Sequence, residues 1–142
     1  FPPGPRRMHG FRRALNDFGL TPDLRFMFNG DFTRESGVEV ARALINAGEL
    51  PRALFVVNDL MAIGVILTLL EAGYRVPEDV AVMGFDNIPE ATIVRPALTT
   101  IAQTPRDLGL KMAESLFSRL ENPSLARRVI EGTYELVIRD SA

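Results

Sequence analysis

Two continuous apolar runs with an apolar helical stretch between them constrain the fold more than any other feature of this sequence. Residues 53–57 (Ala-Leu-Phe-Val-Val) and 80–83 (Val-Ala-Val-Met) do not alternate polar and apolar side chains, and residues 60–70 between them are almost entirely apolar. Strands that are apolar on both faces are typical of a parallel sheet whose two sides are covered. The sequence therefore predicts an α/β fold, with a parallel sheet flanked by helices on both faces.

Polar side chains follow each of these two strands. Asn58 and Asp59 come directly after the first strand, and Asp86 and Asn87 follow the second. Ligands of open parallel sheets bind in the crevice beyond the carboxyl ends of the strands, so these positions predict a small-molecule site. Two plainer interpretations stay open: Asp59 caps the following helix, and Asp86 with Asn87 forms a turn through its own backbone.

The sequence before this unit repeats the order of helix and strand. Apolar residues at helical spacing predict a helix from Pro5 to Gly19, then a strand at 24–28, then a helix that runs to about Ala47 and is closed by Gly48. His9, the one histidine, falls in the first helix and is interpreted as structural or exposed.

The sequence after this unit no longer repeats the regular order of strand and helix. Residues 88–94 predict a short helical or irregular piece, residues 98–102 a strand, and Thr104 the cap of a long helix that Asn122-Pro123 stops. The buried stripe predicted for this long helix consists of Leu108, Met112, Leu116, Phe117 and Leu120. A hairpin or two short strands are predicted at 129–131 and 134–138.

The composition argues against several classes of function. The chain has 142 residues and a formal net charge of −2, whereas domains that bind DNA phosphates have a basic excess. It contains no cysteine and one histidine, and we find no Gly-rich phosphate loop and no metal-ligand spacing. We therefore expect no enzymatic activity, no cofactor and no metal site.

Two features suggest that this sequence is part of a longer protein and contacts a second domain or subunit. It starts with Phe1-Pro2-Pro3-Gly4-Pro5, which is typical of the end of a strand entering a loop, so we interpret the sequence as a fragment of a longer protein. The stretch 60–70 is apolar nearly all round, which predicts burial on more than one side and hence contact with a second domain or subunit.

Eight short motifs, in order along nearly the whole chain, resemble the LacI/GalR family of bacterial transcriptional regulators. They are Arg7-Met8-His9-Gly10-Phe11, Gly30-Asp31-Phe32-Thr33, Asn58-Asp59 with Met61-Ala62 and Gly64, Val76-Pro77-Glu78-Asp79-Val80, Gly84-Phe85-Asp86-Asn87, Pro96-Ala97-Leu98-Thr99-Thr100-Ile101, Leu108-Gly109 and Leu136-Val137-Ile138-Arg139. Each motif alone is common, but their order and register make a chance match improbable.

The resemblance implies a periplasmic-binding-protein-like core of two α/β subdomains with a small effector between them. By similarity, residues 1–97 belong to the C-terminal effector-binding subdomain, 98–125 cross to the N-terminal subdomain, and 126–142 return. It further implies a cytoplasmic homodimer that binds operator DNA only through an N-terminal head absent from this sequence, with no membrane contact. Because the long helix would lack its own subdomain here, we expect it to pack against another copy or to swap between chains.

The resemblance also assigns effector contacts to Arg7, Phe32, Asn58 and Asp86, with Asp59 beside them. The guanidinium offers a fork of donors, the carboxylate accepts from hydroxyls or ring nitrogens, the amide does both, and the ring offers a flat face to a sugar or nucleobase-like effector. Alternatively, Phe32 is a core residue that anchors its loop. Arg7 has the alternative of belonging to a helix face exposed to solvent.

Dimer contacts are assigned by the same resemblance to Met61, Ile63 and Val94. The alternative function is a periplasmic sugar-binding protein of a transport system, which shares the fold and the strand-end site. The motifs at 96–101 and 136–139 favour the regulators.

Overall fold

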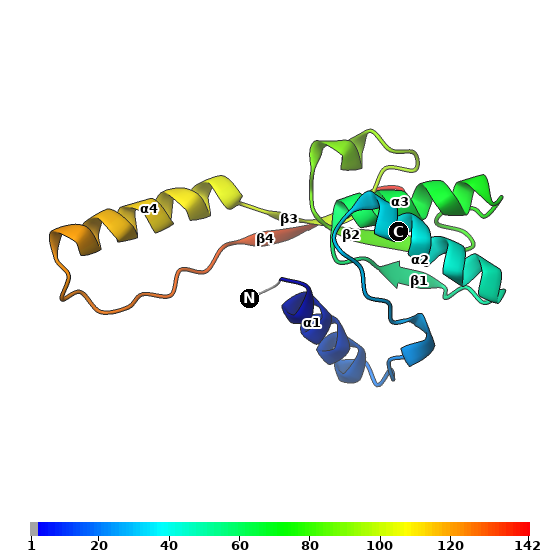
Figure 1. The fold of residues 1–142 in the computed structure, drawn as a ribbon, viewed down its shortest axis with the longest axis horizontal. Helices are drawn as coiled ribbons and strands as arrows, with labels where there is room; N and C mark the ends of the chain where they lie inside the picture. Colours follow the sequence, from blue (N-terminus) through cyan, green and yellow to red (C-terminus); the bar gives the residue numbers. More distant parts are fainter. Residues whose placement is uncertain (1–2) are drawn as a thin grey trace.

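The computed structural model describes residues 3–142, so the predicted strand end at Phe1-Pro2 lies outside the described residues. Figure 1 shows an α/β body from which one helix projects as an arm. The elements in chain order are α1 (Pro3–Asp17), the 3₁₀ helix η1 (Leu24–Phe26), α2 (Arg34–Ala47), β1 (Ala53–Phe55), α3 (Asp59–Glu71), β2 (Ala81–Asp86), the 3₁₀ helix η2 (Pro89–Thr92), β3 (Thr99–Gln103), α4 (Pro105–Glu121) and β4 (Tyr134–Val137).

The strands form one sheet in the order β1-β2-β3-β4. β1 pairs parallel to β2, with Leu54 opposite Val82, and β2 pairs parallel to β3, with Gly84 opposite Thr100. β4 pairs antiparallel to β3, with Leu136 opposite Ile101. The predicted α/β class is confirmed, and the sheet is mixed with mostly parallel strands.

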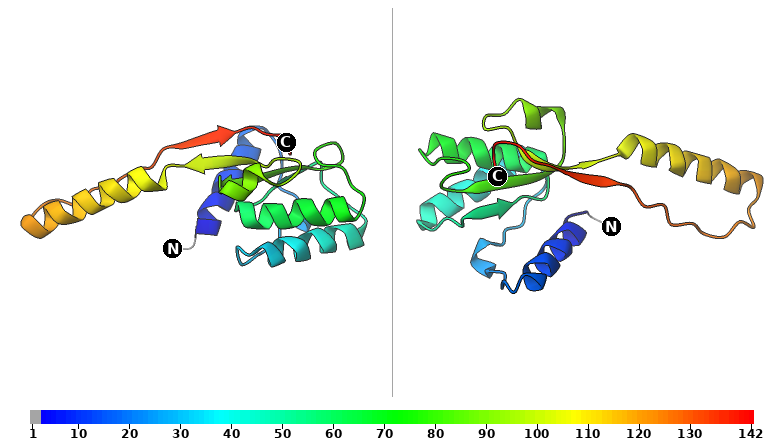
Figure 2. Two further views of the ribbon diagram at one scale, coloured as in Figure 1. Left: turned by 90° about the horizontal axis from the view of Figure 1, so that it is seen from above. Right: turned by 180° about the vertical axis from the view of Figure 1, so that it is seen from behind.

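The helix pair α2 and α3 packs on the sheet (Figures 1 and 2). Ile66 and Leu69 of α3 are fully buried, as the all-apolar stretch predicts. Gly37 and Gly64 let the two helices approach closely, because a Cβ on Gly37 would lie 2.1 Å from the Met61 carbonyl oxygen. Thr33 caps α2 at its start, and Gly48 ends it with a φ of 70°, as predicted.

Helix α1 packs beside β1 through an aromatic contact. The rings of Phe11 and Phe55 stack with centroids 5.4 Å apart. The predicted strand at 24–28 is wrong, because the chain forms η1 there, with the Asp23 carboxylate accepting from the backbone N–H of Arg25. A local side-chain cap of this kind competes with strand pairing for the same backbone groups.

The arm consists of α4 and the chain that returns from it, joined to the body by β3 and β4 (Figure 1). The predicted burial of the α4 stripe is wrong for this chain, since no residue of α4 is buried. Thr104 occupies the N-cap position but makes no capping bond, and its hydroxyl lies 2.9 Å from the hydroxyl of Thr133. The spacing of the stripe is helical, but within residues 3–142 no segment buries it.

The predicted terminal hairpin is also corrected. Residues 129–131 form no strand, and β4 pairs with β3 instead. The second predicted strand, at 134–138, is present as β4. The described residues contain no helix that is both long and apolar enough to cross a membrane.

Candidate functional site

The polar side chains predicted at the strand ends meet at the carboxyl edge of the parallel sheet. Asp86 is the last residue of β2, and Asn58 stands between β1 and α3. Arg7 of α1 reaches both strand ends: its Nη2 donates to Asp86 Oδ1 over 2.9 Å, and its Nη1 donates to the carbonyl oxygen of Val57. One side chain therefore ties α1 to the ends of β1 and β2.

The environment of Arg7 distinguishes it from its arginine neighbours. Its side chain is 14% exposed, and its guanidinium carbon lies 3.8 Å from the centroid of the Phe85 ring. Such a stacked cation is held by the ring quadrupole as well as by its hydrogen bonds. Arg12 and Arg13 are exposed. The interpretation of Arg7 as a solvated helix face is therefore wrong.

The Asp86 carboxylate receives two donors. Its Oδ1 accepts from Arg7 and also from Gln103 Nε2, which lies 2.9 Å away at the end of β3. The backbone at this point is left-handed, with φ of 117° at Asp86 and 56° at Asn87. The Asp86 carboxylate bonds to other side chains and not to the backbone of the pair, so the interpretation of a turn held by its own backbone is wrong. Effector contact by Asp86 stays a prediction.

The left-handed turn is held by two side chains, Arg139 after β4 and Asp59 of α3. Arg139 Nη2 donates to Asn87 Oδ1 over 2.7 Å, and Arg139 Nη1 donates to the carbonyl oxygen of Leu98 over 2.7 Å. The backbone N–H of Ile88 donates to Asp59 Oδ2 over 2.9 Å. Non-glycine residues with positive φ persist when their surroundings fix them, and such strain concentrates at functional sites.

Asn58 and Phe32 are joined by a hydrogen bond. Asn58 Oδ1 accepts from the N–H of Met61 and caps α3, and its Nδ2 donates to the carbonyl oxygen of Phe32 over 2.8 Å. Phe32 is half-buried with a φ of 70°. A Cβ on Gly4 would lie 3.3 Å from Phe32 Cζ, so the ring lies against the first turn of α1.

Asp59 is fully buried within the fold. Its Oδ1 accepts from the Thr100 hydroxyl over 2.6 Å and its Oδ2 from the N–H of Ile88, so it joins α3, β3 and the turn after β2. The predicted N-cap role of Asp59 is wrong, because Asn58 makes the cap. Contact of Asp59 with an effector stays a prediction, and its two oxygens are engaged within the protein.

The loop that carries Phe32 begins at a carboxylate that stays charged. The Thr33 hydroxyl and backbone N–H donate to Asp31 Oδ1, and these two bonds, with a smaller effect of the Ser36 side chain, lower the pKa of Asp31 to about 2. These bonds fix the loop next to the N-terminus of α2, whose partial positive charge also favours an anion.

The three predicted dimer contacts lie in the core of the single chain. Met61, Ile63 and Val94 are 6%, 8% and 9% exposed. They offer little surface to a second subunit, because all three belong to the buried core cluster. The apolar side chains that α3 and its surroundings expose instead are Leu60, Leu67, Leu70 and Ile93.

Sequence reasoning missed Gln103 and the role of Arg139. Gln103 ends β3, the third parallel strand, so the rule that pointed to Asn58 and Asp86 also points to this position. The family motif at 136–139 includes Arg139 but gives it no role in the site, because its contact with Asn87 joins residues 52 positions apart in the sequence.

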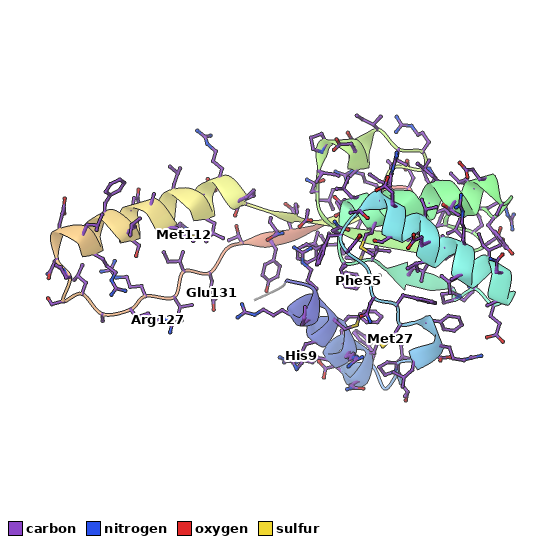
Figure 3. The ribbon with its side chains drawn as sticks, viewed as in Figure 1. His9, Met27, Phe55, Met112, Arg127 and Glu131 are labelled. Carbon is purple, nitrogen blue, oxygen red and sulfur yellow. The ribbon has the colours of Figure 1, made fainter. Side chains whose placement is uncertain are left out.

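A separate apolar cavity of about 220 Å³ lies between α1, β1 and residues 26–28. Phe55 and Met27, labelled in Figure 3, are among its lining residues. A polar effector needs several donors and acceptors, so the cluster around Asp86 and not this cavity is the candidate site. Within residues 3–142 no group of three or more His, Asp or Glu side chains is placed to hold a metal ion.

The sequence matches the family described as periplasmic binding protein-like domain over residues 2–142. It is 43% identical over 135 residues to the HTH-type transcriptional repressor PurR of Photobacterium profundum, an alignment that covers 95% of this chain and 40% of that protein. The chain thus spans about 40% of the length of the curated relatives it matches.

Solved structures agree with this match. A LacI-type transcription regulator from Bifidobacterium animalis superposes with a TM-score of 0.88 at 35% identity, over 95% of this chain and 49% of that one. The complex of the transcriptional regulator CelR with cellobiose superposes with a TM-score of 0.92 at 33% identity, over 98% of this chain and 42% of that one.

Proposed function

Because this chain belongs to the family of periplasmic binding protein-like domains and is a LacI-type effector-binding region, we propose that it senses a small polar ligand for a bacterial transcription regulator. The observation that carries this proposal is the Arg7–Asp86 pair at the carboxyl edge of the sheet. The relatives are transcription regulators, which supports this role over periplasmic transport.

The ligand class follows from the chemistry of the site. Arg7 presents a planar fork of donors, and Asp86, with a side chain 33% exposed, presents acceptors to solvent. Phe32 adds a flat apolar face. Vicinal sugar hydroxyls or the ring nitrogens of a nucleobase match this set, so we propose a sugar or a nucleobase-like effector. The other wall of the site belongs to the N-terminal subdomain of the whole regulator.

The proposed response is a change in the balance between two arrangements of the subdomains. An effector that binds one arrangement better shifts the population toward it. That shift changes the spacing of the DNA-binding heads in a cytoplasmic dimer and so its affinity for the operator. The net charge of −2 on this chain fits a role in which the head alone contacts DNA.

We propose that the dimer forms through exposed apolar side chains next to the buried ones assigned from the sequence. Leu60 and Leu67 are 44% and 38% exposed on α3, and Ile93 is 70% exposed. Replacing Leu67 and Ile93 with Gln in the full-length protein should shift its mass in light scattering from dimer toward monomer. A dimer that survives this double substitution places the interface elsewhere.

The effector proposal is tested by calorimetric titration of the full-length protein with cellobiose, glucose, adenine and guanine. At least one compound should bind, and Asp86→Ala should weaken that binding by about 10-fold or more, since hydrogen bonds to charged groups contribute about 1.5–3 kcal/mol. Glu71→Ala removes an exposed carboxylate at the end of α3 and serves as the control. Equal affinities for Asp86→Ala and the wild type would remove Asp86 from the site.

A further inference from the structure

The two strands that carry the arm both contact the turn at Asp86. Gln103, the last residue of β3, donates to Asp86 Oδ1 over 2.9 Å and stands directly before the N-cap residue of α4. Arg139, two residues after β4, donates to Asn87 Oδ1 over 2.7 Å. The candidate effector carboxylate is thus hydrogen-bonded to one end of the arm, and its neighbour to the other.

The two donors to Asp86 differ in how firmly they are held. Arg7 also donates to Val57 and stacks on Phe85, and its side chain is largely buried. Gln103 is exposed, and its amide is positioned by its bond to Asp86. Both donors use Oδ1 and fill its two lone pairs, so an effector donor that approaches this oxygen competes with them. The amide is the partner that costs less free energy to displace.

We propose that Gln103 is a coupling residue: an effector that engages Asp86 displaces the Gln103 amide, and this release frees the start of α4 from the body. The inference rests on the proposed function of the Asp86 site and adds the route by which occupancy reaches the second subdomain. Arg139 keeps its bonds to Asn87 and Leu98, so the β4 side acts as the fixed point of the movement.

The first test measures affinity in the full-length protein with whichever of cellobiose, glucose, adenine and guanine binds the wild type. Gln103→Leu removes the competing donor, so the affinity should rise about 2- to 10-fold, the worth of one ordinary hydrogen bond. A residue that merely supported the fold would lower the affinity when replaced. Glu135→Leu is the matched control, because Glu135 is exposed on β4 opposite Ala102. An unchanged or weaker affinity in Gln103→Leu overturns the proposal.

The second test needs no effector and therefore separates this proposal from the proposed function. This chain has no cysteine, so Glu71→Cys on α3 and Glu114→Cys on α4 add spin-label sites, after replacement of any cysteines elsewhere in the full-length protein. The distance distribution between the labels should broaden or shift in Gln103→Leu and stay as in the wild type in Glu135→Leu. Identical distributions in all three overturn the coupling role, even where effector binding at Asp86 is established.

Discussion

The body and the arm of this molecule both carry helices with apolar faces, but with opposite outcomes. In the body, Leu44 of α2 and Leu69 of α3 are 2% and 0% exposed. In the arm, Phe117 and Leu120 of α4 are 65% and 67% exposed. Helical spacing of apolar residues indicates which face of a helix seeks cover, but not which segment supplies that cover.

The arm also shows what its apolar face does contact. Met112 and Leu116 of α4 and Ile130 of the returning chain border a shallow depression. Figure 3 labels Met112 on α4, and Arg127 and Glu131 on the returning chain. This contact is local and leaves the stripe open to solvent. The body is stabilised by tertiary burial, whereas the arm depends on its own helix propensity and on the β3–β4 pairing.

The largest expected difference between body and arm comes from paired truncations. Leu69→Ala should lower the free energy of unfolding of the 142-residue chain by about 2–5 kcal/mol, because it opens a cavity in a closed core. Leu116→Ala in the arm should change it by less than about 0.5 kcal/mol. Urea unfolding followed by circular dichroism measures both.

A large loss of unfolding free energy for Leu116→Ala in the isolated chain would contradict the difference between body and arm. Such a loss would mean that a second copy of the chain covers the α4 stripe. The same substitution in the full-length protein sharpens the comparison. There we expect a cost close to that of a core residue, because we propose that the N-terminal subdomain of the whole regulator covers the stripe.

Removing a buried carboxylate and removing an exposed one should change the free energy of unfolding by amounts that differ less than those of the two leucine truncations. Asp59→Ala leaves the fully buried Thr100 hydroxyl and the Ile88 N–H without their acceptor and should cost about 1–3 kcal/mol. Asp107→Ala, in the exposed first turn of α4, should cost about 0.3–1 kcal/mol through the helix dipole. Chemical denaturation of the two variants gives the comparison, and equal costs would contradict the structural role of Asp59.

The smallest expected effect is on acid stability. Hydrogen bonds from the Arg75 side chain and backbone lower the pKa of Asp79 to about 2 from its usual 3.8. A carboxylate with a lowered pKa in the folded state stabilises the fold above pH 4, and this contribution is lost as the pH falls toward 2. The thermal midpoint should therefore fall less steeply over this range in Asp79→Asn than in the wild type. Parallel curves would mean that the pair contributes nothing in solution.

Part of the site could be predicted because it depends on sequence patterns only a few residues long. Apolar runs define the parallel strands, and polar residues directly after them fall at one edge, which located Asn58 and Asp86. The contacts of Arg7 with Asp86, and of Arg139 with Asn87, join residues 79 and 52 positions apart. Such pairs depend on how the elements pack, so only the resemblance singled out Arg7, and no pattern assigned Arg139 to the site.

The sequence by itself determined the α/β class, the helix ends at Gly48 and Asn122, and the strand-end position of the polar cluster, because these depend on side-chain periodicity and backbone preferences over a few residues. Only the tertiary structure decided that α4 is bare, that β4 joins β3, and that Asp59 is internal while Gln103 contacts Asp86. Burial depends on which other segment occupies the neighbouring space, and that segment lies far away in the sequence or outside this chain.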